Sequence, residues 1–154
     1  MQARMTNPAF LLPDGMKGIG GILKAVGTGG ISHELQEIVG LRVSQINGCS
    51  ACVHAHHANL VKAGESAERI AAVAAWREAP FFDDAERAAL ALGEAVTRLA
   101  DRSGEAVDDQ LWDRVVIHFD EKQLAALILL IGVTNMFNRL NATIQEPAGN
   151  DWGN

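Results

Sequence analysis

The chain has 154 residues, of which 48% are hydrophobic, 21% charged and 5% aromatic. This length and composition fit one globular domain, and two cysteines are too few for a disulfide-rich secreted scaffold. The formal net charge of −6 argues against nucleic-acid binding, which usually needs a basic surface. The two cysteines are Cys49 and Cys52, and their spacing as a CxxC pair is the feature to explain.

Residues 1–31 combine a proline-containing arm with a glycine-rich segment. The arm, residues 1–14, lacks the continuous apolar core of a secretory signal. Residues 15–30 hold seven glycines but neither of the usual glycine-rich phosphate-binding motifs. We therefore expect a short, loose helix with flexible ends here rather than a nucleotide-binding loop.

From Ser32 onward, apolar residues recur at helical spacing, and no convincing strand pattern appears. N-cap and capping-box residues (Ser32, Ser66, Asp83 with Glu86, and Asp120 with Gln123) predict where helices begin. The expected helices cover residues 32–47, 49–63, 66–79, 83–99, 108–117 and 120–140. The sequence thus predicts a compact all-α domain of about six helices over residues 32–142, followed by a C-terminal tail over residues 143–154.

The last expected helix is unusually apolar. Its longest apolar run, residues 124–133, is ten residues long, whereas a membrane-spanning helix needs about 20. Because the run covers most of the helix circumference, it must be covered on several sides, either within the monomer or by another subunit. We expect a cytoplasmic protein that does not bind a membrane.

Two thiols and a histidine that could act as their base share one face of the expected helix 49–63. At about 100° per residue, Cys49, Cys52 and His56 lie close together on the helical wheel. The unpaired N–H groups of the first helical turn stabilise a thiolate. His56 lies one turn beyond Cys52 and could exchange a proton with it, and a second thiol three residues away could close a disulfide. The spacing indicates thiol–disulfide or peroxide chemistry and requires no cofactor.

Two other interpretations of these residues stay open. A zinc ion could be held by Cys49, Cys52 and His56 with a fourth ligand, for which the candidates are His54, His57, His118 and Glu37. The cysteines could also be a purely structural pair of buried thiols. His54 and His57 point away from the Cys49–Cys52–His56 face on the wheel, and neither His33 nor His118 has an evident partner.

Glu37 lies opposite the apolar stripe of its own helix, so periodicity alone predicts a solvated carboxylate. It could reach the cysteines only if that helix were covered on two faces and folded back on helix 49–63 at Asn47-Gly48. In that arrangement, Glu37 could exchange a proton near Cys49 through water.

The stretch from Glu37 to His56, EIVGLRVSQINGCSACVHAH, resembles the carboxymuconolactone decarboxylase superfamily and, within it, the alkylhydroperoxidase D-like branch. That branch has a Glu twelve residues before a CxxCxxxH motif. The resemblance continues through Trp76, through the helix start at residues 82–87 and through Asn138-Arg139-Leu140, and covers most of residues 32–142.

The resemblance implies an all-α fold that assembles as homo-trimers or homo-hexamers. It also implies a peroxidase cycle on hydroperoxides, in which Cys52 becomes a sulfenic acid and Cys49 then resolves it to a disulfide. His56 and Glu37 would form the proton relay, and a lipoyl-bearing or thioredoxin-like dithiol would be the reductant. One departure is Ala51, where the best-known alkylhydroperoxidase D proteins have histidine.

We therefore predict a thiol-dependent peroxidase or disulfide reductase. The enzymatic alternative is a decarboxylase-like lyase that uses Glu37 and His56 without thiol redox, although the true decarboxylases of the superfamily usually lack the CxxC pair. The non-enzymatic alternative is a zinc-binding or oligomeric scaffold protein.

Overall fold

A computed structural model describes residues 2–101 and 104–149, and within them the chain is entirely helical. The elements are α1 (Pro8–Leu11), α2 (Pro13–Gly27), α3 (His33–Asn47), α4 (Ser50–Lys62), α5 (Ala67–Ala72), the 3₁₀ helix η1 (Val73–Ala75), α6 (Asp84–Thr97), the 3₁₀ helix η2 (Leu99–Asp101), α7 (Asp109–Val116) and α8 (Glu121–Ile144). The predicted all-α class is confirmed, with eight α-helices in these residues rather than about six.

The difference lies mainly at the N-terminus, where the arm contains α1 and the glycine-rich segment forms the 15-residue helix α2. The expectation of a short, loose helix was wrong. Both α1 and α2 have a proline in the first turn, where the missing backbone N–H breaks no hydrogen bond of the helix. Ile19 and Val26 of α2 are buried, and α2 packs along α8. This burial outweighs the low helix propensity of glycine.

The local start signals identified in the sequence operate as expected. The side chains of Ser32, Ser66, Asp83 and Asp120 each accept a backbone N–H at the start of a helix, and so does that of Asp108, for which no capping role was predicted. Asp83 with Glu86 and Asp120 with Gln123 form complete capping boxes. The helix expected over residues 66–79 is shorter and ends in η1, while α8 continues to Ile144, beyond the expected end. Of the predicted tail, residues 143–149 are described and residues 150–154 lie outside the described part.

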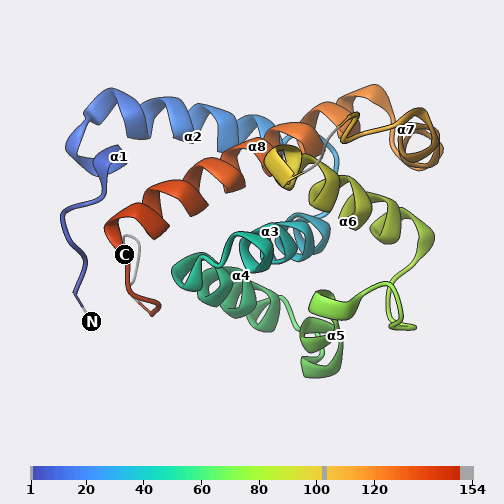
Figure 1. The fold of residues 1–154 in the computed structure, drawn as a ribbon, viewed down its shortest axis with the longest axis horizontal. Coiled ribbons are helices and arrows are strands. Elements are labelled where there is room, and N and C mark those ends of the chain that lie inside the picture. Colours follow the sequence, from blue (N-terminus) through green and yellow to red (C-terminus); the bar gives the residue numbers. More distant parts are fainter. Residues whose placement is uncertain (1, 102–103, 150–154) are drawn as a thin grey trace.

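Helix α8 runs through the middle of the molecule, with α2 along one side and α3 and α4 on the other (Figure 1). Leu127 and Ile131 are fully buried, whereas Ile128 and Leu129 are each 43% exposed, so α8 is not covered all round in the monomer. Among the described residues, only α8 is long and apolar enough to cross a membrane, and 44% of its most apolar window is buried inside the fold. Its packing against α2, α3, α4 and α6 is that of a core helix.

Helix α3 is covered on two faces, which is one of the conditions under which Glu37 could lie near the cysteines. Val39 and Val43 belong to one hydrophobic core that includes residues of α6 and α8. Ile38 and Leu41 belong to a second core with Leu60 of α4. The chain then reverses at Gly48, whose φ of 67° places it in the left-handed region that favours glycine. The resulting α3–α4 hairpin brings Glu37 and the cysteines to the same part of the molecule.

Candidate functional site

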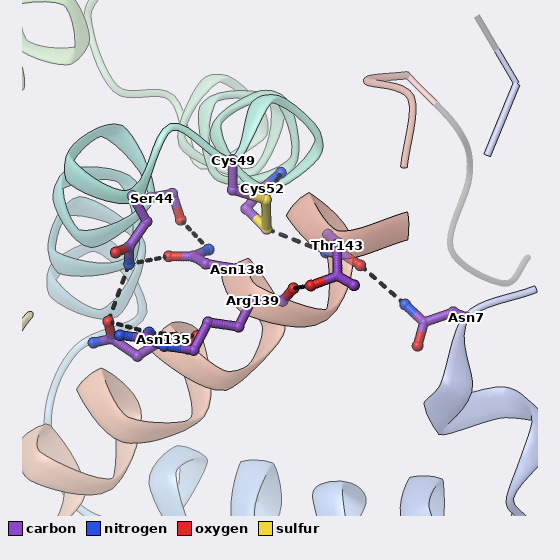
Figure 2. The surroundings of a disulfide bond; sticks show 10 residues. Asn7, Ser44, Cys49, Cys52, Asn135, Asn138, Arg139 and Thr143 are labelled. Atoms are coloured by element: carbon purple, nitrogen blue, oxygen red, sulfur yellow. Dashed lines mark hydrogen bonds between the residues drawn. A yellow bond between two sulfur atoms is a disulfide. The ribbon is translucent and has the colours of Figure 1, made fainter. Parts of the chain in front are cut away.

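The CxxC pair lies at the start of α4. Cys49 is the N-cap residue of α4, and its sulfur accepts the backbone N–H of Cys52 at 3.4 Å. The two cysteines form a disulfide with a Cα–Cα separation of 5.4 Å, and both residues are buried. Figure 2 shows the disulfide between the α3–α4 hairpin and the C-terminal half of α8. The structure therefore represents the oxidised form of the pair.

Glu37 and His56 form the second part of the site. Glu37 Oε2 lies 2.7 Å from His56 Nδ1 and also accepts a hydrogen bond from the Asn59 amide at 3.2 Å. The Glu37 side chain is only 12% exposed, so the interpretation as a solvated carboxylate was wrong. The second apolar face of α3, formed by Ile38 and Leu41, is what buries this carboxylate.

The environment of Glu37 keeps it ionised near neutral pH. Burial opposes ionisation of the Glu37 carboxyl, but the hydrogen bond and charge of His56, with smaller contributions from Asn59 and His33, hold its pKa below the ordinary value. The ionised Glu37 carboxylate accepts a hydrogen bond from His56 Nδ1–H. This fixes the ring tautomer and leaves His56 Nε2 as the nitrogen that can take up or release a proton.

Gly40 makes room for this pair. A Cβ atom added at Gly40 would collide with the imidazole ring of His56, which lies directly against the α3 backbone. Gly40 lies one turn after Glu37, so a single face of α3 both supports the His56 ring and supplies its carboxylate partner. Periodicity gave no reason to select Gly40, because the close approach exists only in the folded hairpin.

Cys52, His56 and Glu37 line the same cavity, which has a volume of about 220 Å³. Five of its ten other lining residues are apolar side chains of α2 and α8: Leu23, Val26, Leu130, Val133 and Phe137. Cys49 lines a different cavity, of similar volume, together with the C-terminal end of α8. The two cysteines thus line two different cavities, and of the two only Cys52 shares its cavity with the acid–base pair.

Of the remaining histidines, all of which the structure describes, only His33 lies near the site. His33 Nδ1 lies 3.9 Å from Glu37 Oε1, a partner that the sequence did not reveal. His54 and His57 line a separate cavity, in agreement with their direction on the helical wheel. The rings of His118 and Phe119 lie in an edge-to-face arrangement, with 6.5 Å between their centroids. In residues 2–101 and 104–149, no three His, Cys, Asp or Glu side chains are grouped so that they could hold a metal ion, so the zinc interpretation finds no ligand set there.

A group of asparagines lies around the disulfide (Figure 2), and the sequence had predicted no hydrogen-bonding role for them. Asn141 of α8 donates its amide to Cys52 Sγ at 3.2 Å and accepts a hydrogen bond from Asn7 at 2.9 Å. Asn138 donates to Ser44 and accepts from Asn47 of α3. The available signal was the presence of Asn138 and Asn141 within a strongly apolar helix, since buried amides are uncommon unless they are hydrogen-bonded.

Comparison with known proteins identifies the family. Residues 13–95, which include both cysteines, His56 and Glu37, match the Carboxymuconolactone decarboxylase family, and the chain belongs to this family. The uncharacterized protein YdfG of Bacillus subtilis (strain 168) is 35% identical over 138 residues, which cover 90% of this chain and 92% of YdfG.

Solved structures with the same fold include ATU0492 from Agrobacterium tumefaciens, a protein of unknown function described as a candidate antioxidant defence protein AhpD. It is 27% identical, with a TM-score of 0.87 over 97% of this chain and 100% of that chain. The debrominase Bmp8 in its apo form is 22% identical, with a TM-score of 0.73 over 88% of this chain and 72% of that chain, and this likeness shows the fold alone. The family and the alkylhydroperoxidase D-like fold expected from the motif are therefore confirmed.

Proposed function

We propose that this protein is a thiol-dependent peroxidase that reduces hydroperoxides through Cys52 and Cys49. The observation that carries the proposal is that Cys52 shares one cavity with the Glu37–His56 pair and is already joined to Cys49 in a disulfide. The likeness to a candidate AhpD protein supports the same chemistry. The apolar lining of the cavity suits the organic part of an alkyl hydroperoxide.

In the first step, the Cys52 thiolate attacks the terminal oxygen of the hydroperoxide. The S–O bond forms while the O–O bond breaks, and the leaving alkoxide takes a proton from His56 to depart as an alcohol. Cys52 is then a sulfenic acid. Ionised Glu37 stabilises the imidazolium that donates this proton, because the two groups are hydrogen-bonded at 2.7 Å.

In the second step, Cys49 gives up its proton and its thiolate attacks the sulfur of Cys52. The S–S bond forms and the S–O bond breaks, and the oxygen leaves as water after taking a proton. The product is the disulfide seen in the structure. A dithiol reductant, of the lipoyl-bearing or thioredoxin-like kind, then supplies two electrons and two protons and restores both thiols.

The quaternary structure and compartment belong to the same proposal. We place the protein in the cytoplasm, where a dithiol reductant keeps such a pair cycling. The exposed apolar side chains of Ile128 and Leu129 on α8 fit an assembly of trimers or hexamers, because an isolated monomer would leave them in water.

Intact mass of the reduced protein after one equivalent of hydroperoxide tests the function. The wild-type protein should lose two hydrogens as the disulfide forms. Cys49→Ser should instead gain one oxygen at Cys52, and Cys52→Ser should react far more slowly. Serine at position 49 keeps an N-cap acceptor for α4, so this variant preserves the helix start. Wild-type thiols that stay reduced and unmodified would contradict the proposal.

A further inference from the structure

The contact between Asn141 and Cys52 has no role in the cycle described above. Asn141 lies in the last turn of α8 and is 1% exposed, and its Nδ2 donates to Cys52 Sγ at 3.2 Å. Cys49 Sγ uses a different donor, the backbone N–H of Cys52. The two sulfurs therefore depend on separate hydrogen-bond donors, one of which is a side chain that can be changed.

The orientation of the Asn141 amide is determined by Asn7. The Oδ1 atom of Asn7 accepts the backbone N–H of Ala9 at 3.0 Å as the N-cap of α1, so the Nδ2 atom of Asn7 is the one that faces Asn141. It donates to Asn141 Oδ1 at 2.9 Å. With its oxygen engaged in this way, Asn141 can present only its NH₂ group to the sulfur.

The surrounding contacts hold this arrangement in place. Asn7 is 6% exposed, so water does not compete freely for its amide. The backbone N–H of Arg4 donates to the carbonyl of Ile144 at 2.8 Å, which ties the segment before α1 to the end of α8. The N-terminal arm thereby connects to the redox site through two amides in series.

We propose that Asn141 is the hydrogen-bond donor that stabilises the Cys52 thiolate, and that Asn7 is a positioning residue that keeps this donor turned toward the sulfur. A thiolate is a stronger acceptor than a neutral thiol or a disulfide sulfur, so the contact favours the ionised, reduced form of Cys52. A larger thiolate fraction at neutral pH speeds the attack on a substrate. The consequence for turnover rests on the proposed function, whereas the effect on thiol ionisation does not.

The test measures the pH dependence of alkylation of Cys52 by iodoacetamide in a Cys49→Ser background. Adding Asn141→Ala should raise the pKa of the Cys52 thiol by about one unit, which is about tenfold less thiolate below that pKa. Adding Asn7→Ser keeps an N-cap acceptor and the net charge but removes the amide donor, so Asn141 is free to turn its oxygen toward the sulfur. The pKa should then rise in the same direction, by about half a unit, or about threefold in thiolate.

Asn135→Ala is the matched control, because Asn135 belongs to the same helix and hydrogen-bonds to Asn47 without contacting either sulfur. Its Cys52 pKa should equal that of the parent. Thermal unfolding identifies the variants that remain cooperatively folded, and the comparison uses those. An unchanged pKa in folded Asn141→Ala or Asn7→Ser overturns the proposal, as does an equal rise in Asn135→Ala.

Alkylation requires no peroxide, so this test separates the inference from the proposed function. Protein whose thiol pKa shifts as expected but which does not react with hydroperoxide would support the role of Asn141 and refute the peroxidase. If all variants reacted with hydroperoxide at the same rate and had the same thiol pKa, the peroxidase function would be supported and the role of Asn141 refuted.

Discussion

Two buried carboxylates, Glu94 and Glu37, show how the choice of partner decides what a buried charge does. Glu94 of α6 accepts hydrogen bonds from Arg42 at 2.7 Å and from the Trp76 indole at 2.9 Å. It also forms an ion pair with Arg77 at 2.6 Å. Glu37 pairs with a histidine and with the neutral amide of Asn59. Both side chains are almost enclosed, at 7% and 12% exposure.

Two of the three partners of Glu94, Arg42 and Arg77, are permanent cations, whereas the main partner of Glu37 can itself release a proton. Burial opposes ionisation of Glu94, but Arg77, Trp76 and Arg42 together lower the pKa of its carboxyl to about 2. This carboxylate stays charged across the physiological range and joins α3, α6 and the segment after η1. Glu37 instead holds a titratable ring at the edge of a cavity. The first arrangement suits stability and the second suits proton transfer.

The largest effect is expected from Glu94→Gln, because it leaves the partly buried Arg42 guanidinium without its counter-charge. The free energy of unfolding should fall by about 3 kcal/mol, measured by urea denaturation. The rate of reaction with hydroperoxide per folded molecule should stay within about twofold of wild type. Glu78→Gln, at an exposed acid of the same region, is the control and should change stability by less than about 0.5 kcal/mol.

Glu37→Gln should have the reverse effect, with a large loss of reaction rate and little loss of stability. Loss of the carboxylate removes the support for the His56 imidazolium, and the rate of hydroperoxide reduction should fall about 100-fold. Stability should change by about 1 kcal/mol or less, since glutamine can still accept from His56 and Asn59 is a neutral partner. Stopped-flow peroxide consumption and urea denaturation measure the two effects. A wild-type rate in this variant would remove Glu37 from the relay.

Acid should expose the contribution of Glu94 to stability. Its pKa is lowered on folding from 4.5 to about 2, so the stabilisation is fully present above pH 4.5 and is lost as the pH falls through about 2. Between pH 6 and pH 3, the loss from this group should be about 2 kcal/mol. Glu94→Gln should lose correspondingly less than wild type over this interval in urea titrations. Parallel losses in both proteins would show that other groups dominate acid unfolding.

The smallest effect is expected from Gly40→Ala, which sharpens the comparison by disturbing the Glu37 site without touching a charge. The added methyl should push the His56 ring away from Glu37 and reduce the peroxide reaction about tenfold, at a cost of about 1 kcal/mol in stability. Gly132→Ala is the matched control, because nothing lies within 4 Å of a Cβ at this position of α8. That variant should gain about 0.5 kcal/mol and keep its rate. Equal rates in the two variants would contradict the packing role of Gly40.

Much of the fold was predictable because its signals are local. The caps at Ser32, Asp83 and Asp120 and the left-handed Gly48 each depend on a few neighbouring residues, and each appears where expected. The CxxC pair at the start of α4 is also a local feature. Helix α2 was underestimated because the seven glycines of residues 15–30 predict a weak helix, whereas packing against α8 and α1 stabilises it.

The amino-acid sequence by itself determined the all-α class, most helix starts and the placement of two thiols and a histidine at one helix start. The family resemblance added Glu37, against the evidence of periodicity. Only the tertiary structure decided that Glu37 is enclosed, that Gly40 supports His56 and that Asn141 reaches Cys52 from 89 residues away. The reason is physical: capping and helical spacing act within a turn or two, whereas burial and close approach depend on which helices pack together.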